Sequence, residues 1–200
     1  MKKLIVASNN KNKIREIKQI FSQHNIDVIS MEQAGIDMDV VEDGNTFMEN
    51  ACKKAKQIHD ISGGIVLADD SGIMVKGLNG APGIYSARFC GEHGNDKKNN
   101  EKLLKLLEGK SEEDRKARFV CAIAIISESG QTLKVTGEVE GIIANKELGQ
   151  NNFGYDPLFY VPEYKMTFAQ MSPELKNSIS HRAKALKVLV GKIDKLMEEG

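Results

Sequence analysis

The chain contains 200 residues, in which 28 lysines and arginines balance 28 aspartates and glutamates. Without a net charge, the chain has no general attraction to nucleic-acid polymers or to an anionic membrane, so neither is expected as a partner. The longest apolar run, residues 119–126, is far shorter than the roughly 20 residues that a transmembrane helix needs. The basic start is followed by only four apolar residues, which predicts a first strand and not a signal peptide.

Length and cysteine content narrow the class of protein further. The length suits one large domain, or two lobes that share a core. Cys52, Cys90 and Cys121 are odd in number, lie far apart and form no C-x-x-C motif. They are expected to be free thiols in a reducing cytoplasm, because structural disulfides are rare in that compartment.

Apolar periodicity in the first half of the chain predicts alternating strands and helices. Ile14, Ile17 and Ile20 recur at helical spacing after a polar loop. Thr46 precedes Glu49 by three residues, a capping-box pattern that marks a helix start. In chain order we expect a strand at 3–7, a helix after residue 13, a strand at 27–30, a helix at 46–58 and a strand at 65–68.

The second half of the chain continues this mixture of elements. Residues 117–126 are apolar on both faces, as expected of a central strand in a covered sheet. A turn at 128–130 leads into an alternating segment at 133–140, which predicts a hairpin. Ser172 and Pro173 mark a helix start. With a helix at 99–107, a strand at 158–161 and a final amphipathic helix, these elements predict a mixed α/β architecture.

Two adjacent carboxylates, Asp69 and Asp70, follow the apolar run that ends at Ala68. Side by side they repel each other, and they lose hydration if the strand end lies in a cleft, so a compensating partner is expected. Glu42 and Asp43 form an ordinary turn taken alone, but together with the aspartate pair they make a set of hard oxygen ligands. Mg²⁺ is usually held by one or two carboxylates plus substrate phosphates and waters, which would leave one carboxylate free as a base.

Lys54 lies within the apolar stripe that Phe47, Ala51 and Ala55 form at helical spacing. A buried ammonium group is unfavourable unless the side chain reaches out to solvent or meets an anion. The pattern does not decide between these two alternatives. In the second case, the anion is expected to be the aspartate pair at 69–70 or a phosphate beside it.

The loop S-N-N-K-N-K, between the first strand and the first helix, offers a pattern for binding anions. Free N–H groups at a helix start attract phosphates, and lysines add positive charge. Asn9 and Asn10 tolerate the left-handed backbone that exposes such groups. An ordinary capped loop with solvated lysines explains the same residues, and this stretch alone favours that interpretation.

Two later motifs concern a flat ring. In N-N-F-G-Y-D-P, two aromatic residues beside a glycine suit a platform under a base, although the loop alone favours a structural turn with buried rings. In S-I-S-H-R, His181 and Arg182 lie in the first turn of the last helix if Ser180 caps it, or mid-helix if that helix runs on from Pro173. Arginine only donates hydrogen bonds, so this pair would favour a base carbonyl over an exocyclic amine.

Taken in order, six motifs of the chain strongly resemble the inosine triphosphate pyrophosphatase family: S-N-N-K-N-K, E-D-G-N-T-F-M-E-N-A, L-A-D-D-S-G, A-P-G-I-Y-S-A-R, F-G-Y-D-P and S-H-R. These are the non-standard purine nucleoside triphosphate pyrophosphatases, also called XTP/dITP diphosphatases. Each motif is weak alone, but the six in order are highly specific and span residues 3–190. The chain departs from the family at Asn9, where glycine is usual, and asparagine tolerates the same backbone region.

The resemblance implies an α/β fold with a long, mixed, twisted β-sheet flanked by helices. It implies a single domain over residues 1–200, in which two lobes share the sheet and enclose a nucleotide-binding cleft. It also implies a cytoplasmic homodimer that uses Mg²⁺ to hydrolyse ITP, dITP and XTP to the monophosphate and pyrophosphate, thereby cleansing the nucleotide pool.

The same resemblance gives roles to individual residues, motif by motif. Glu42 and Asp70 would bind the metal, with Asp70 also the proton acceptor. Asp69 would support the metal or its water, and Lys54 would contact a phosphate. The remaining residues would bind the substrate: Ser8, Asn9, Asn10, Lys11, Asn12 and Lys13 the triphosphate, Ser71 the nucleotide, and Phe153, Gly154, Tyr155, Asp156, Lys176, His181 and Arg182 the base.

Two other functions use a similar set of residues. A non-catalytic nucleotide sensor would have the same loop and pocket, but it would gain little from a base beside the metal. A Maf-like pyrophosphatase acting on modified pyrimidine nucleotides is expected to lack the S-H-R motif.

Overall fold

The structure, a computed structural model, describes residues 2–198, with side chains as far as residue 193. None of the helices in this range is long and apolar enough to cross a membrane. The strands are β1 (Lys2–Val6), β2 (Ile26–Ser30), β3 (Ile65–Val75), β4 (Lys116–Ile126), β5 (Thr132–Ile143), β6 (Phe159–Val161) and β7 (Met166–Thr167). The α-helices are α1 (Lys11–Phe21), α2 (Phe47–Ser62), α3 (Asp96–Leu106), α4 (Pro173–Ile179) and α5 (His181–Glu198).

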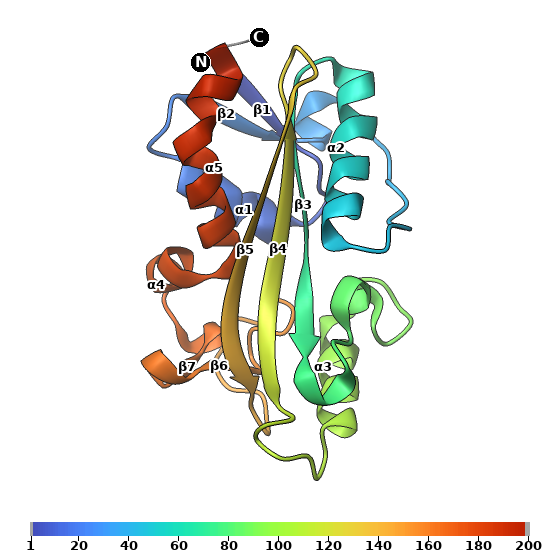
Figure 1. The fold of residues 1–200 in the computed structure, drawn as a ribbon, viewed down its shortest axis with the longest axis vertical. Coiled ribbons are helices and arrows are strands. Elements are labelled where there is room, and N and C mark those ends of the chain that lie inside the picture. The colour runs from blue at the N-terminus through green and yellow to red at the C-terminus, as the bar shows by residue number, and fades with distance from the viewer. Residues whose placement is uncertain (1, 199–200) are drawn as a thin grey trace. The chain divides into compact units, whose positions relative to one another are not determined.

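The strands form one sheet of seven, in the order β2-β1-β3-β4-β5-β6-β7 (Figure 1). Strand β1 runs parallel to both β2 and β3, whereas β6 runs antiparallel to both β5 and β7. The sheet is therefore mixed, and helices flank it. This confirms the α/β fold class that the sequence predicts.

The chain divides into two compact units. Unit 1 comprises residues 1–70, 121–137 and 182–200, and unit 2 comprises residues 71–120 and 138–181. Strands β3, β4 and β5 contribute residues to both units, and the division within β3 falls directly after Asp70. The nucleotide cleft expected from the resemblance stays a prediction.

In unit 1, both faces of the sheet are covered by helices. Side chains from α1 and α5, such as Ile17 and Leu186, pack on one face with Leu67 of β3. Side chains from α2, such as Ile58, pack on the other face with Ala68. Figure 1 shows α2 separated from α1 and α5 by the strands. Successive residues of β3 therefore meet different helices, as the alternation of a strand requires.

The core of unit 2 is rich in aromatic residues. Phe119 of β4 packs against Phe159 of β6, with ring centroids 4.6 Å apart, and against Phe168 at 5.8 Å. Leu103 and Leu107, from α3 and the residue after it, complete this cluster. Burying such a side chain contributes roughly 1.5–3 kcal/mol, so the cluster gives unit 2 a core of its own.

The structure differs from the sequence expectations at several boundaries. Strand β3 does not end at Ala68 but continues through both aspartates to Val75, and β7 was not predicted. Thr46 caps α2 by accepting the N–H of Glu49, but the Glu49 carboxylate accepts from Asn45 and not from Thr46, so the capping box is incomplete. Helix α4 ends before Ser180 and α5 begins after it, so of the two alternatives that the sequence left open, the last helix starts at His181.

Candidate active site

Asp69 and Asp70 lie in the middle of β3, and their side chains point to opposite faces of the sheet. Leu67, two residues before Asp69, belongs to the face covered by α1 and α5, and Ala68 belongs to the face covered by α2. The two carboxylates therefore do not share one environment, and each has its own partners within unit 1.

Asp69 is fully buried, and both of its oxygens meet cations. Oδ1 lies 3.0 Å from Lys13 Nζ, and Oδ2 accepts from Nε and Nη2 of Arg182, each at 3.1 Å. The thiol of Cys121 also donates to Oδ2, at 3.6 Å. Burial alone would raise the pKa of Asp69, but the charges of Lys13 and Arg182 outweigh it and hold the pKa far below its usual range. Asp69 is therefore a stable anion that ties α1 and α5 to β3.

Arg182 has two carboxylate partners, because its Nη1 also bonds Oε2 of Glu16 in α1. Its side chain is 2% exposed. Burial disfavours the guanidinium charge, but Asp69 and Glu16 outweigh this and raise the pKa of Arg182. These contacts favour an anchoring role, so base recognition by the guanidinium stays a prediction that the geometry does not favour.

Asp70 has a different environment. Its Oδ2 accepts from Nδ2 of Asn50, a fully buried residue of α2, at 3.0 Å. Burial raises the pKa of Asp70 and the charge of Glu42 adds to this, while the charges of Lys54 and Lys13 lower it only in part. A carboxyl group with a raised pKa is a better proton acceptor than an ordinary aspartate.

Asn50 also fixes the loop that brings Glu42 to this site. Its Oδ1 accepts the N–H of Gly44 at 2.8 Å. A side chain at Gly44 would place a Cβ 2.7 Å from that oxygen, so only glycine allows this approach. Because Gly44 donates to Oδ1, the amide group of Asn50 must turn its NH₂ toward Asp70.

Lys54 meets an anion, which decides between the two alternatives that its position in the apolar stripe left open. Its ammonium group donates to Glu42 Oε1 at 2.5 Å and to the backbone carbonyl of Asp69 at 2.7 Å. The residue is 8% exposed. The partner is thus Glu42 and the β3 backbone, and not the side chains of the aspartate pair directly.

The carboxylates of unit 1 fit a divalent cation only as part of a site. Among residues 2–198 with described side chains, no three His, Cys, Asp or Glu side chains are grouped to hold a metal ion. Glu42 and Asp70 offer hard oxygens near enough for one charge to act on the other. This donor set suits Mg²⁺ if substrate phosphates and waters supply the remaining ligands. Asp69 is outside the set, because Lys13 and Arg182 occupy its oxygens, so the geometry does not favour its predicted support of a metal.

The first loop is a capped connection between β1 and α1. Asn10 Oδ1 accepts the N–H groups of Asn12 and Lys13, at 3.0 and 3.2 Å, and Ser8 Oγ accepts the N–H of Asn10 at 3.2 Å. Asn9 donates to Asp39 Oδ1 at 2.7 Å. Neither Asn9 nor Asn10 adopts the left-handed backbone, so that reason for exposed N–H groups is wrong. Lys11 is exposed, whereas Lys13 is directed to Asp69.

The residues predicted to bind the base lie mostly in unit 2. Lys176 Nζ bonds Asp156 Oδ2 and lies 5.0 Å from the ring centroid of Phe153, which is half-buried. His181 stacks on Phe119 with centroids 4.6 Å apart and planes 8° from parallel. The structure therefore brings together Phe153, Asp156 and Lys176, and it gives His181 a separate stacking partner.

Tyr155 and Ser71 complete the predicted set in unit 2. The Tyr155 ring is part of the core, and its hydroxyl donates to the Ser86 carbonyl at 2.8 Å. Burial, together with the charge of Asp96, raises the pKa of this phenol. Of the two aromatics in the loop, Tyr155 is therefore the structural ring, and Phe153 is the half-buried one, whose contact with a base stays a prediction. Ser71 follows Asp70 in β3 and is half-buried.

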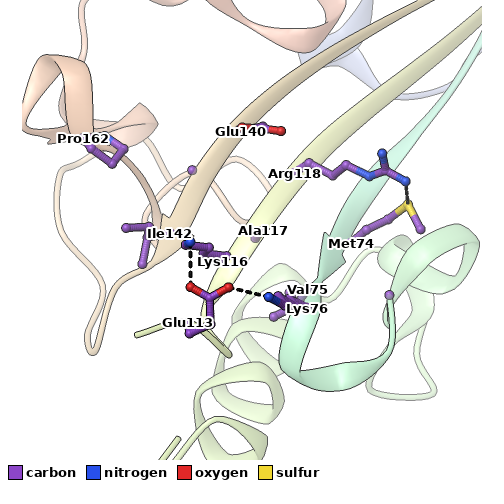
Figure 2. A pocket seen from close by; sticks show the side chains of 12 residues that line it. Met74, Val75, Lys76, Glu113, Lys116, Ala117, Arg118, Glu140, Ile142 and Pro162 are labelled. Carbon is purple, nitrogen blue, oxygen red and sulfur yellow. Dashed lines mark hydrogen bonds and ion pairs between the residues drawn. The ribbon is translucent and has the colours of Figure 1, made fainter. Parts of the chain in front are cut away.

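A cavity of about 710 Å³ lies on another part of unit 2 and contains none of the predicted site residues (Figure 2). Glu113 pairs there with Lys76 and with Lys116, and Arg118 contacts the sulfur of Met74 at 3.7 Å. The charges in its wall are thus largely satisfied by one another. This cavity adds nothing to the site described above.

Sequence reasoning missed two buried polar residues of this site, Glu16 and Asn50. Glu16 is 6% exposed and lies one helical turn from Lys13, next to the apolar stripe of α1. Asn50 precedes Lys54 by one turn of α2 and is fully buried. Both residues flank an apolar helix stripe and lie one turn from a lysine already predicted to be in the site, and this spacing is the signal that could have found them.

The chain matches the family model of the Ham1 family over residues 4–192. It belongs to the Ham1 family. This Ham1 chain is 53% identical to the dITP/XTP pyrophosphatase of Clostridium perfringens (strain 13 / Type A), over 94% of this chain and 96% of that protein. The family membership confirms the resemblance that the six motifs indicate.

Solved structures agree with this membership. The Ham1 protein of Staphylococcus aureus is 44% identical, with a TM-score of 0.85 over 97% of this chain and 99% of that one. The nucleoside-triphosphatase / dITP/XTP pyrophosphatase of Mycobacterium abscessus is 38% identical, with a TM-score of 0.76 over 94% of this chain and 98% of that one. The Ham1 fold is therefore shared over nearly the whole length.

Proposed function

We propose that this Ham1 protein is a nucleoside triphosphate pyrophosphatase that acts on the non-standard purine nucleotides dITP, XTP and ITP. It adds water across the bond between the α- and β-phosphates and releases the monophosphate and pyrophosphate. The first two substrates follow from the names of relatives that are 46–53% identical, and ITP follows from the motif resemblance. The observation that carries the proposal is Asp70, a buried carboxyl group of raised pKa beside Glu42 and Lys54.

The residues of unit 1 divide the phosphate chemistry among themselves. Asp70 accepts the proton of the attacking water, and Asn50 holds its carboxylate in place. Glu42 and Asp70 together would hold Mg²⁺, which supplies positive charge to the phosphates when bound. Lys54 and Lys13 add fixed positive charge, which stabilises the negative charge of the triphosphate.

Base recognition is assigned mainly to residues of unit 2, together with Arg182 of unit 1. Phe153 offers a ring face to a flat purine, and Lys176 and Asp156 offer a donor and an acceptor beside it. His181 and Arg182 are proposed to favour the C6 oxygen of hypoxanthine or xanthine over the amine of adenine. The remaining parts of the proposal are a homodimer, a cytoplasmic location and one domain over residues 1–200.

A nucleotide panel tests the proposed function directly. Purified protein is incubated with ITP, dITP, XTP, ATP, GTP and a modified pyrimidine triphosphate, with Mg²⁺ or with EDTA, and pyrophosphate is measured separately from phosphate. We expect pyrophosphate from the first three substrates only, and only with Mg²⁺. Turnover of the pyrimidine alone would favour a Maf-like enzyme, and tight binding without product would favour a sensor.

A further inference from the structure

Helix α3 holds the loop that carries Phe153 through hydrogen bonds to both backbone groups of one loop residue, Gly154. The N–H of Gly154 donates to Asp96 Oδ2 at 2.8 Å, and the carbonyl of Gly154 accepts from Asn100 Nδ2 at 3.1 Å. Asp96 and Asn100 are four residues apart on the helix, so their side chains lie on the same face. The two contacts therefore clamp the Gly154 backbone against α3.

The two hydrogen bonds hold the residue whose backbone conformation sets the direction of the loop. Gly154 has a φ of +56°, in the left-handed region that favours glycine. On its far side, Tyr155 is anchored in the core by its ring and by its bond to Ser86. The half-buried Phe153 precedes Gly154, so its orientation depends on how the Gly154 backbone is held.

The amide group of Asn100 is not explained by stability alone. Its Nδ2 donates to Gly154 and also to Glu147 Oε1 at 2.9 Å. Both partners are acceptors, which fixes the orientation of the amide. Its Oδ1 is buried without a hydrogen-bond partner among the described residues, and Asn100 is 3% exposed. A buried acceptor left unsatisfied is unfavourable for the fold, so the residue is better explained by what its NH₂ group holds.

We propose that Asp96 and Asn100 are positioning residues for base recognition. They fix Gly154 so that Phe153 presents its ring face to the purine, while Lys176 remains beside that ring. They contact neither the base nor the phosphates themselves. This inference rests on the proposed function, because it gives α3 a part in the same substrate site.

Paired variants test the clamp against a simple loss of helix stability. Asp96→Ala and Asn100→Ala each remove one contact to Gly154, whereas Asp96→Asn keeps an acceptor for its N–H. Asn95→Ala is the matched control, because Asn95 caps the same helix by accepting the N–H of Lys98 at 3.1 Å without touching Gly154. For each protein, kcat and KM for dITP are measured. The Kd is measured for the monophosphate product, which carries the base, and for pyrophosphate, which has none.

We expect Asp96→Ala and Asn100→Ala to raise KM and the nucleotide Kd about five- to twentyfold, part of what stacking on an aromatic ring contributes. The Kd for pyrophosphate and kcat should change less than twofold. Asp96→Asn should restore most of the affinity, and Asn95→Ala should leave it unchanged. Equal effects of Asn95→Ala and Asp96→Ala, or equal weakening of nucleotide and pyrophosphate, would overturn the inference.

A second measurement does not depend on turnover. The chain contains no tryptophan, so Phe153→Trp places the only tryptophan of the chain in the loop, where its emission can be excited selectively over that of the tyrosines. In that background, adding Asp96→Ala should increase acrylamide quenching of Trp fluorescence, and adding Asn95→Ala should not. If the wild type releases no pyrophosphate, the proposed function fails while this quenching still reports on the clamp. Unchanged quenching with Asp96→Ala would overturn the clamp even in an active enzyme.

Discussion

The ion pairs of Asp69 make the most quantitative prediction for this protein, through Asp69→Asn. The substitution keeps the shape of the side chain but removes its charge. One carboxylate oxygen faces Lys13 and the other faces Arg182, so either orientation of the new amide turns an NH₂ group toward a cation. Arg182 keeps Glu16 as a partner, which limits the damage.

Removing one partner of a buried ion pair costs about 3–5 kcal/mol, and the remaining pair with Glu16 places the expected loss at about 3 kcal/mol at pH 7. For a chain of this size, that loss lowers Tm by roughly 6–12 °C. Urea unfolding measures the loss in free energy. Asp60→Asn is the control, because it breaks the Lys56–Asp60 pair, whose side chains are 71% and 53% exposed, and it should cost less than about 0.5 kcal/mol.

Wild type and Asp69→Asn should differ in their free energy of unfolding, and the pH dependence of that difference tests whether the charge of Asp69 causes it. The folded pKa of Asp69 lies below its usual value, so only the unfolded chain takes up a proton at this residue as the pH falls through about 3.9. The stability that Asp69 contributes is therefore fully present above that pH and is lost below it. The difference in free energy of unfolding between wild type and Asp69→Asn should therefore become smaller from pH 5 to pH 3. A loss under about 1 kcal/mol at pH 7, or a difference that does not become smaller, would refute the reasoning.

Three further predictions concern catalysis. Asp70→Asn should lower kcat about 10²–10⁴-fold through loss of the base. Urea unfolding at pH 7 should show unchanged or higher stability, because the raised pKa means that burial disfavours this carboxylate. Near-normal turnover would exclude Asp70 as the base. Lys54→Met should lower stability by about 1–3 kcal/mol, since the Asp69 carbonyl loses a hydrogen-bond donor. It should also move the acid limb of the kcat/KM profile to higher pH, because Lys54 lowers the pKa of Asp70. An acid limb at the same pH would contradict the electrostatic role of Lys54. Arg182→Ala should reduce kcat/KM for ITP more than for ATP, and equal losses on both would leave Arg182 as an anchor for Asp69 alone.

Local patterns were sufficient to predict most elements of the fold. The spacing of Ile14, Ile17 and Ile20 located α1, and the apolar run at 117–126 located β4 to within one residue. The two-residue strand β7 carries too little pattern to be recognised. The end of β3 was misplaced because two carboxylates in a buried strand are tolerated only through partners distant in sequence, and Arg182 is 113 residues from Asp69.

The candidate site was predicted less completely, for a related reason. Residue type and motif order pointed to Lys54 and Asp70, and in the structure the charge of Lys54 acts on Asp70. They could not show that Lys13 and Arg182 are both directed to Asp69, because pairing depends on how α1 and α5 pack on β3. Nor could they show that Tyr155 is a core residue while Phe153, two positions earlier, is half-buried.

The pleat of β3 explains how two neighbouring carboxylates acquire different chemistry. Asp69 points to the face where Lys13 and Arg182 lie, and its pKa is lowered. Asp70 points to the face of α2, where burial and Glu42 raise its pKa despite the opposing charge of Lys54. Environments that separate the pKa values of two adjacent acids also separate their roles. Asp69 therefore remains charged and holds two helices to the strand, and Asp70 is left as the carboxyl group suited to exchange a proton. Substituting both aspartates in one chain should give a stability loss through Asp69 and a turnover loss through Asp70 that are not fully additive, because the charges of Lys13 and Lys54 act on both carboxylates.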